Sequence, residues 1–238
     1  MKYSIIIPCY NEEASLGGLI ARLAPLQSRY DLEYVLVENG SKDGSRRYLK
    51  ENIENKYPKI SVVYVDVNKG YGYGLQQGMK AAKGDYVGWI HADLQIAPEE
   101  LIPFFDFLEN RKTDENVFLK GRRSNRGLFD VFFTVGQTVF DSLLFSAKLS
   151  DIGAIPVLFS RHLIEELNID DMPNDFSIEL YVYKEARLRN YLIRRFKVTL
   201  EKRGKGASSW NHGLRSKIRQ SRVIFSDSLK IRRGEKVL

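Results

Sequence analysis

The chain has 238 residues, of which 43% are hydrophobic and 28% are charged, and its formal net charge is +7. These values fit one large soluble domain with a sizeable core. The one cysteine, Cys9, excludes an internal disulfide framework and a cysteine-based zinc site. Strand-like sequence follows Met1 and Lys2 directly, so we expect no signal peptide and a cytoplasmic location.

The first 90 residues alternate strand-like and helix-like segments. The apolar runs with the length of buried strands are residues 4–8, 32–37, 60–65 and 86–90. The segments with helical spacing or helix caps follow Asn11, span 45–55 and end near Ala82. We expect Pro8 to end the first strand, because proline cannot donate to a central ladder. Three strand–loop–helix repeats closed by a fourth strand predict an α/β doubly wound fold.

The second half continues with mixed elements. Further helices are expected at 98–110, 161–167, after a cap at 174–177, and at 214–229, and strands at 117–119, before Arg161 and at 194–200. Residues 128–149 are predicted to form a phenylalanine- and leucine-rich amphipathic helix, or a broken pair of helices, whose polar interruptions exclude a membrane span. This helix either packs in the core or lies at a membrane interface or an oligomer contact.

Basic residues dominate the sequence from Arg187 onward. Such a surface suits nucleotide phosphates, an anionic membrane or nucleic acid, and a solvated basic tail is the alternative. No recognition motif for nucleic acid accompanies the charge, so we expect no nucleic-acid partner. We expect one domain at 1–202 and a basic helical extension of it at 203–238.

Polar side chains alternate at the end of the fourth predicted strand. If strand geometry persists, His91, Asp93 and Gln95 share one face. An imidazole, a carboxylate and an amide oxygen at a strand's carboxyl end suit a divalent cation. A strand end with solvated polar residues is the other interpretation. Glycines 70, 72 and 74 precede a helix, which favours a phosphate at the helix N-terminus or a tight turn without a ligand.

Four segments in order resemble the family-2 glycosyltransferases with the GT-A fold. They are the strand and loop 5–13, the loop 37–45 (VDDGSxDGS in the family), the loop 68–72 (NxGxG) and the segment 91–95, HADLQ, where DADLQ is expected. Residues 120–123, 150–153 and 203–210 resemble segments of polyprenyl-phosphate sugar synthases. The resemblance implies a Rossmann-like, mostly parallel central sheet flanked by helices.

The resemblance also implies site residues. Those for the nucleotide-sugar are Pro8, Tyr10, Glu12, Glu38, Asn39, Lys69, Gly70, Ala92 and Asp93. Those for Mg²⁺ or Mn²⁺ are Asp93, with Gln95 and His91. The residues implied to be catalytic are Asp93, Arg122, Arg123, Asp151 and Asp175. The residues implied to bind the acceptor phosphate are Arg122, Arg123 and Arg126, because guanidinium groups match phosphate geometry.

Two residues depart from the family pattern. His91 replaces an acidic residue, and imidazole suits Mn²⁺ better than Mg²⁺. Asn39 replaces the second acidic residue of its loop, which bears on base preference. Either change suggests weakened metal dependence, a different donor or a degenerate transferase.

The sequence predicts an inverting, metal-dependent glycosyltransferase that takes a UDP- or GDP-sugar and a polyprenyl-phosphate or lipid-linked glycan acceptor. A lipid phosphate needs no general base, whereas a sugar hydroxyl does, with Asp151 and Asp175 as candidates. Transfer to a sugar hydroxyl in capsule or lipopolysaccharide assembly is one alternative, and a catalytically weak nucleotide-sugar-binding or scaffold protein is another. The absence of a QxxRW motif argues against a processive synthase. Peripheral association with the cytoplasmic membrane and a homo-oligomer through 128–149 are further expectations.

Overall fold

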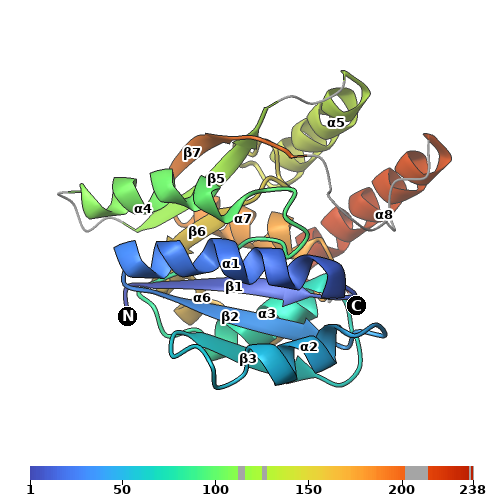
Figure 1. Ribbon diagram of the computed structural model, residues 1–238. Coiled ribbons are helices and arrows are strands. Elements are labelled where there is room, and N and C mark those ends of the chain that lie inside the picture. The colour runs from blue at the N-terminus through green and yellow to red at the C-terminus, as the bar shows by residue number, and fades with distance from the viewer. Residues whose placement is uncertain (112–115, 125–127, 202–213, 236, 238) are drawn as a thin grey trace.

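The computed structural model describes residues 1–111, 116–124, 128–201, 214–235 and 237, with only the backbone path described for 128–134 and 214–222. A seven-stranded sheet forms the centre, in the order β3-β2-β1-β4-β6-β5-β7 (Figure 1). The strands are β1 Tyr3–Cys9, β2 Leu32–Asn39, β3 Ile60–Val65, β4 Tyr86–Trp89, β5 Val117–Arg123, β6 Val157–Ser160 and β7 Leu192–Val198. All pairings are parallel except those of β6 with β4 and β5.

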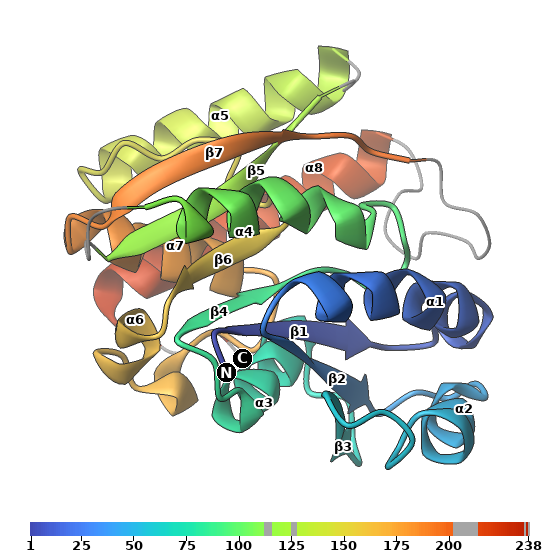
Figure 2. The same ribbon diagram turned by 60° about the vertical axis from the view of Figure 1, so that its left-hand side comes forward.

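Helices cover both faces of this sheet (Figures 1 and 2). The α-helices are α1 Glu13–Arg29, α2 Ser45–Asn52, α3 Tyr71–Ala81, α4 Ile102–Glu109, α5 Leu128–Leu144, α6 His162–Glu165, α7 Ile178–Leu188 and α8 Leu214–Arg233, and short 3₁₀ turns span Pro98–Leu101 and Ile169–Asp171. This arrangement confirms the predicted α/β class with a mostly parallel sheet.

Alternation along the strands divides the core into two apolar clusters. Ile5 and Ile7 face the cluster that contains α1 and α4, whereas Ile6 faces the cluster that contains α3 and α7. All three isoleucines are fully buried. A strand buried on both faces reads as a continuous apolar run, which is why the first strand was visible in the sequence.

The expectation that Pro8 ends the first strand was wrong. β1 continues to Cys9, and Pro8 lies opposite Val37 of β2. Ile6 accepts a hydrogen bond from the N–H of Ile90, so alternate residues of β1 turn their backbone groups toward β4. Pro8 is one of these residues, and pairing with β4 already ends at Ile6. The missing N–H of proline therefore costs no ladder hydrogen bond.

Helices α5 and α8 run side by side and project from the body of the molecule (Figures 1 and 2). Phe140 of α5 meets Phe225 of α8 edge to face at 4.7 Å. The end of the chain returns to the body, where Ile231 and Val237 are buried in the core. Within the described residues no helix is both long and apolar enough for a bilayer core.

Candidate functional site

The strand directions bring distant segments to one edge of the sheet. β1, β2, β3 and β4 are parallel, so the loops after them emerge together. β6 is antiparallel to both β4 and β5. The carboxyl end of β5 and the segment before β6 therefore lie at the same edge. Open α/β sheets bind their ligands at such carboxyl ends.

A cavity of about 530 Å³ opens beyond β1, β2 and β3. It is lined by Tyr10, Gly40, Ser41, Lys42, Asp66, Val67 and Asn68. Tyr10 is 41% exposed, which leaves its ring available to a planar ligand. Gly40 has φ of +71°, and a Cβ there would lie 2.6 Å from the backbone nitrogen of Asn68. Only glycine lets these two loops approach so closely.

Glu38 and Asn39 lie behind this cavity rather than in its lining. Both are almost fully buried. Glu38 Oε1 accepts the N–H of Ser41 at 2.6 Å, and Asn39 Nδ2 donates to the carbonyl of Gly70 at 3.1 Å. These bonds join the loop after β2 to itself and to the start of α3. The structure thus gives both side chains a role in shaping the cavity.

The remaining predicted nucleotide-binding positions surround this region. The N–H of Glu12 donates to Ser45 Oγ at 2.9 Å, and the Glu12 carboxylate accepts the hydroxyl of Ser15 at 2.7 Å. Lys69 is exposed, with its Nζ 5.0 Å from the ring centre of Tyr73. Pro8 and Gly70 are half-buried and Ala92 is buried.

The segment after β4 is a turn, which corrects the expected strand geometry. β4 ends at Trp89, and Leu94 has φ of +58°. The N–H of Gln95 donates to Asp93 Oδ1 at 3.1 Å, a short Asx turn. His91, Asp93 and Gln95 are all half-buried and stay within this one turn, but strand alternation does not align them.

A buried polar network that the sequence analysis missed lies behind this turn. Tyr71, the first residue of α3, donates its hydroxyl to Glu179 Oε1 at 2.9 Å, and Trp89 Nε1 donates to the same oxygen at 2.8 Å. The Tyr71 hydroxyl also lies 3.0 Å from His91 Nε2. Glu179 on α7 is 6% exposed. Two features of the sequence could have indicated this network: a glutamate on an otherwise apolar helix face, and Lys120 inside a buried strand. Charged residues are rarely buried unless they are paired.

Burial shifts the pKa values of Glu179 and of the nearby Lys120 in the directions that favour their neutral forms. It lowers the pKa of Lys120 to about 7, although the negative charges of Glu179 and Asp151 oppose the shift. Burial likewise raises the pKa of Glu179, against the positive charge of Lys120 and the hydrogen bonds from Trp89 and Tyr71. Lys120 donates to the carbonyl of Ile152 at 2.8 Å and lies 4.2 Å from the ring centre of Tyr183. The lysine thus joins the sheet to the segment before β6.

Arg123, the last residue of β5, forms an ion pair with Asp151, which lies in the segment before β6. Arg123 Nε donates to Asp151 Oδ1 at 2.9 Å, its Nη2 contacts the same oxygen, and its N–H donates to Oδ2 at 3.2 Å. Arg195 lies 3.9 Å from Asp151. This pairing with guanidinium groups makes Asp151 a poor candidate for a general base. Arg122 is exposed, and Arg126 falls outside the described residues.

The loop before α7 covers the start of α3. Tyr73 donates its N–H to the carbonyl of Asn174 at 3.0 Å, and a Cβ on Gly72 would lie 2.7 Å from the carbonyl oxygen of Asp175. The glycines therefore serve close packing of two backbones, and one amide of the helix N-terminus is already occupied. Burial raises the pKa of Asp175, and the neighbouring carboxyl of Asp227 adds to the rise against hydrogen bonds from Ser177.

Asp93 and its neighbours fit a divalent metal shared with a ligand. Within the described residues no group of three or more histidine, cysteine or acidic side chains is placed to hold a metal by itself. Mg²⁺ and similar cations are often bound through one or two carboxylates plus substrate phosphates. Burial and the nearby Glu179 raise the pKa of Tyr71, and the negative charge of Asp93 adds to the rise. Asp93, His91 and Gln95 are thus suitable as the protein's share of such a site.

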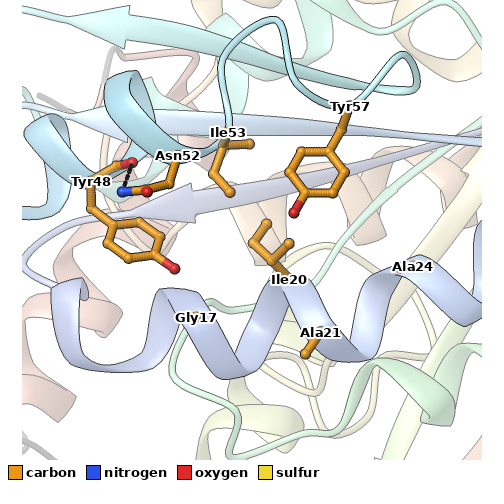
Figure 3. A pocket seen from close by; sticks show the side chains of 8 residues that line it. All are labelled: Gly17, Ile20, Ala21, Ala24, Tyr48, Asn52, Ile53 and Tyr57. Carbon is orange, nitrogen blue, oxygen red and sulfur yellow. Dashed lines mark hydrogen bonds between the residues drawn. The ribbon is translucent and has the colours of Figure 1, made fainter.

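A second hollow of about 330 Å³ lies between α1 and α2, away from these loops (Figure 3). It is lined by Gly17, Ile20, Ala21, Ala24, Tyr48, Asn52, Ile53 and Tyr57. The amide of Asn52 donates to the carbonyl of Tyr48 at 3.1 Å. None of these lining residues carries a charge, so this hollow is not a candidate for diphosphate chemistry.

Comparison with known families identifies the chain. The model of "Glycosyl transferase family 2" matches residues 4–130, which include β1 to β5 and the loops at their carboxyl ends. The chain belongs to glycosyl transferase family 2. This membership confirms the family resemblance of the four motifs.

Two curated relatives extend the match. The undecaprenyl-phosphate 4-deoxy-4-formamido-L-arabinose transferase of Aeromonas hydrophila subsp. hydrophila is 37% identical over 170 residues, which are 69% of this chain and 50% of that protein. The transferase of the same name from Proteus mirabilis is 30% identical over 175 residues, which are 70% of this chain and 51% of that protein. The chain thus spans about half the length of the curated relatives it matches.

A solved structure has the same fold. Glucosyl-3-phosphoglycerate synthase from Mycobacterium tuberculosis, crystallised with Mn²⁺, UDP and glucosyl-3-phosphoglycerate, superposes with a TM-score of 0.72. The match covers 98% of this chain and 80% of the synthase at 20% identity. The likeness confirms the predicted GT-A fold for this family-2 member.

Proposed function

We propose that this family-2 protein is an inverting glycosyltransferase that moves a sugar from a nucleotide-sugar to a polyprenyl phosphate. The observation that carries the proposal is that the 530 Å³ cavity and the Asp93 turn follow the carboxyl ends of neighbouring parallel strands of one sheet. The cavity suits a nucleoside, and Asp93 suits the diphosphate that follows it. The names of the curated relatives, which specify undecaprenyl phosphate, support this acceptor class.

The chemistry is a single displacement. A phosphate oxygen of the acceptor attacks the anomeric carbon, a new carbon–oxygen bond forms, and the bond to the diphosphate breaks with its electron pair on the leaving oxygen. The acceptor phosphate is already largely ionised near pH 7, so no base has to remove a proton from it. Mg²⁺ or Mn²⁺ bound at Asp93 would neutralise the charge on the leaving diphosphate. Arg122 is suited to hold the acceptor phosphate.

Helix α5 supports a membrane-borne acceptor. Val135, Val139 and Leu143 recur every four residues and are 53%, 52% and 77% exposed. The neighbouring α8 is rich in arginine and lysine in sequence. An apolar stripe beside basic charge favours the interface of an anionic membrane. We expect Leu143→Asp to lower the fraction of protein that floats with anionic vesicles. Equal flotation of the variant and the wild type would contradict this role of α5.

Asp175 favours one alternative, transfer to a sugar hydroxyl. Its raised pKa suits a general base, which an alcohol acceptor requires. The two functions differ in the acceptor consumed. Purified protein with Mn²⁺ and a panel of UDP- and GDP-sugars should give a charged lipid product with undecaprenyl phosphate. A product only with glycan acceptors would favour the alternative, and sugar-nucleotide binding without any transfer would favour a scaffold.

A further inference from the structure

The hydrogen-bond directions in the network behind the Asp93 turn can be assigned from chemistry. An indole Nε1–H can only donate, so the contact from Trp89 makes Glu179 Oε1 an acceptor. The Tyr71 hydroxyl reaches the same oxygen at 2.9 Å, and with no proton on Oε1 the hydroxyl must donate to it. Its one proton is then committed. The Tyr71 oxygen can therefore only accept from His91 Nε2, which lies 3.0 Å away.

Packing holds this chain of groups in place. The Tyr71 ring stacks on Phe176, with centroids 4.6 Å apart and planes at 16°. It meets the His91 ring edge to face, with centroids 5.4 Å apart and planes at 86°. Glu179 is buried, which raises its pKa, but Oε1 accepts both contacts whether the carboxyl group is ionised or carries its proton on Oε2. The ring of His91 thus faces a fixed acceptor.

We propose that Tyr71, anchored by Glu179, is a positioning residue that keeps the proton of neutral His91 on Nε2. The lone pair of the ring is then on Nδ1. Ligating histidines in proteins are oriented in this way, by donating the other ring N–H to a fixed partner. At the proposed metal site, which rests on the proposed function, His91 would ligate through Nδ1. A ring nitrogen in place of a carboxylate shifts the preference from Mg²⁺ toward Mn²⁺.

The direct test is nitrogen NMR of metal-free protein labelled with ¹⁵N-histidine at about pH 8, where histidine is neutral at its usual pKa. The chain has three histidines, and the His91 signals are those that disappear in His91→Asn. We expect a protonated Nε2 and an unprotonated Nδ1. In Tyr71→Phe we expect the two nitrogen shifts to move toward each other, as the tautomers mix. Tyr73→Phe, two residues along α3, is the matched control and should leave both shifts unchanged.

Three outcomes would overturn the proposal: a proton on Nδ1, protons on both nitrogens, or a wild-type pattern in Tyr71→Phe. A second readout is Mn²⁺ affinity, measured by electron paramagnetic resonance with nucleoside diphosphate present. We expect Tyr71→Phe to weaken Mn²⁺ binding by about ten-fold or more, and Tyr73→Phe to leave it unchanged. A wild type that binds no Mn²⁺ would contradict the proposed function instead, because the tautomer is measured without metal.

Discussion

At the scale of single residues, Asp93 is the side chain on which the proposed chemistry depends most. The motif around it was enough to propose Asp93 as a metal ligand with Gln95 assisting, because both lie in one short segment. The motif did not predict the turn, since Leu94 with φ of +58° breaks a strand that residue types alone allow. Glu179 was missed because its partner Tyr71 is 108 residues away. No local pattern links residues so far apart.

Asp93→Asn should remove activity without unfolding the protein. The amide oxygen can still accept the N–H of Gln95, so we expect the free energy of unfolding to change by less than about 1 kcal/mol. The loss of charge should lower kcat by on the order of 100-fold or more. Asp85→Asn, at an exposed position before β4, is the control. Transfer assays and urea unfolding measure both effects, and full turnover in Asp93→Asn would rule out this assignment.

At the scale of elements, the packing of the loop 172–177 on α3 joins the segment before α7 to the start of α3. The sequence predicted both segments but not their contact, so glycines 70, 72 and 74 left open either a phosphate loop or a tight turn without a ligand. The antiparallel placement of β6 between β4 and β5 was not predicted either, because the sequence of a four-residue apolar strand does not indicate its direction in the sheet. Tertiary pairing decides such features.

Gly72→Ala should displace this loop. Its Cβ would meet the carbonyl oxygens of Pro173 and Asp175, and backbone atoms cannot move aside as a flexible side chain can. We expect a destabilisation of about 1–3 kcal/mol, the cost of overpacking, together with a lower kcat/KM. Gly136→Ala is the matched control, because its Cβ meets no described atom within 4 Å. That variant should be neutral or stabilising by up to about 1 kcal/mol. Equal stability of the two variants would contradict the packing.

The contact of α5 with α8 should make stability depend on pH through Asp141. The residue is fully buried, and within the described residues neither carboxylate oxygen makes a hydrogen bond of ordinary geometry. The nearby Ser228 hydroxyl donates to the carbonyl of Ile224. Burial raises the pKa of Asp141 from 3.8 to about 6, against smaller opposing effects of the Ser228 and Gln137 side chains.

The folded state therefore binds more protons than the unfolded state between pH 3.8 and about 6. The free energy of unfolding falls as pH rises through that window. Asp141→Asn should accordingly be more stable than the wild type by about 1–3 kcal/mol at pH 8. The advantage should shrink toward pH 5. Urea titrations at both pH values measure it, and a variant that is less stable at pH 8 would show that the carboxylate is paired there.

At the scale of the whole molecule, the repeated strand–loop–helix pattern was enough to predict the sheet and the edge at which its loops converge. Buried runs such as Ile5-Ile6-Ile7 made the strands evident, and parallel strands leave their carboxyl ends at one edge. The cavity itself depends on how the loops after β1, β2 and β3 fold against each other. That arrangement requires the three-dimensional structure.

The central claim is that this edge binds a nucleoside diphosphate with a divalent cation. Thermal unfolding with UDP, GDP, CDP or dTDP, each with Mn²⁺ or with EDTA, tests it most directly. One nucleotide with Mn²⁺, at about 100 times its Kd, should stabilise the protein by about 2.7 kcal/mol, or roughly 5–10 °C. EDTA and Asp93→Asn should each abolish the shift. No shift with any nucleotide, or a shift that persists in EDTA and in Asp93→Asn, would contradict the claim.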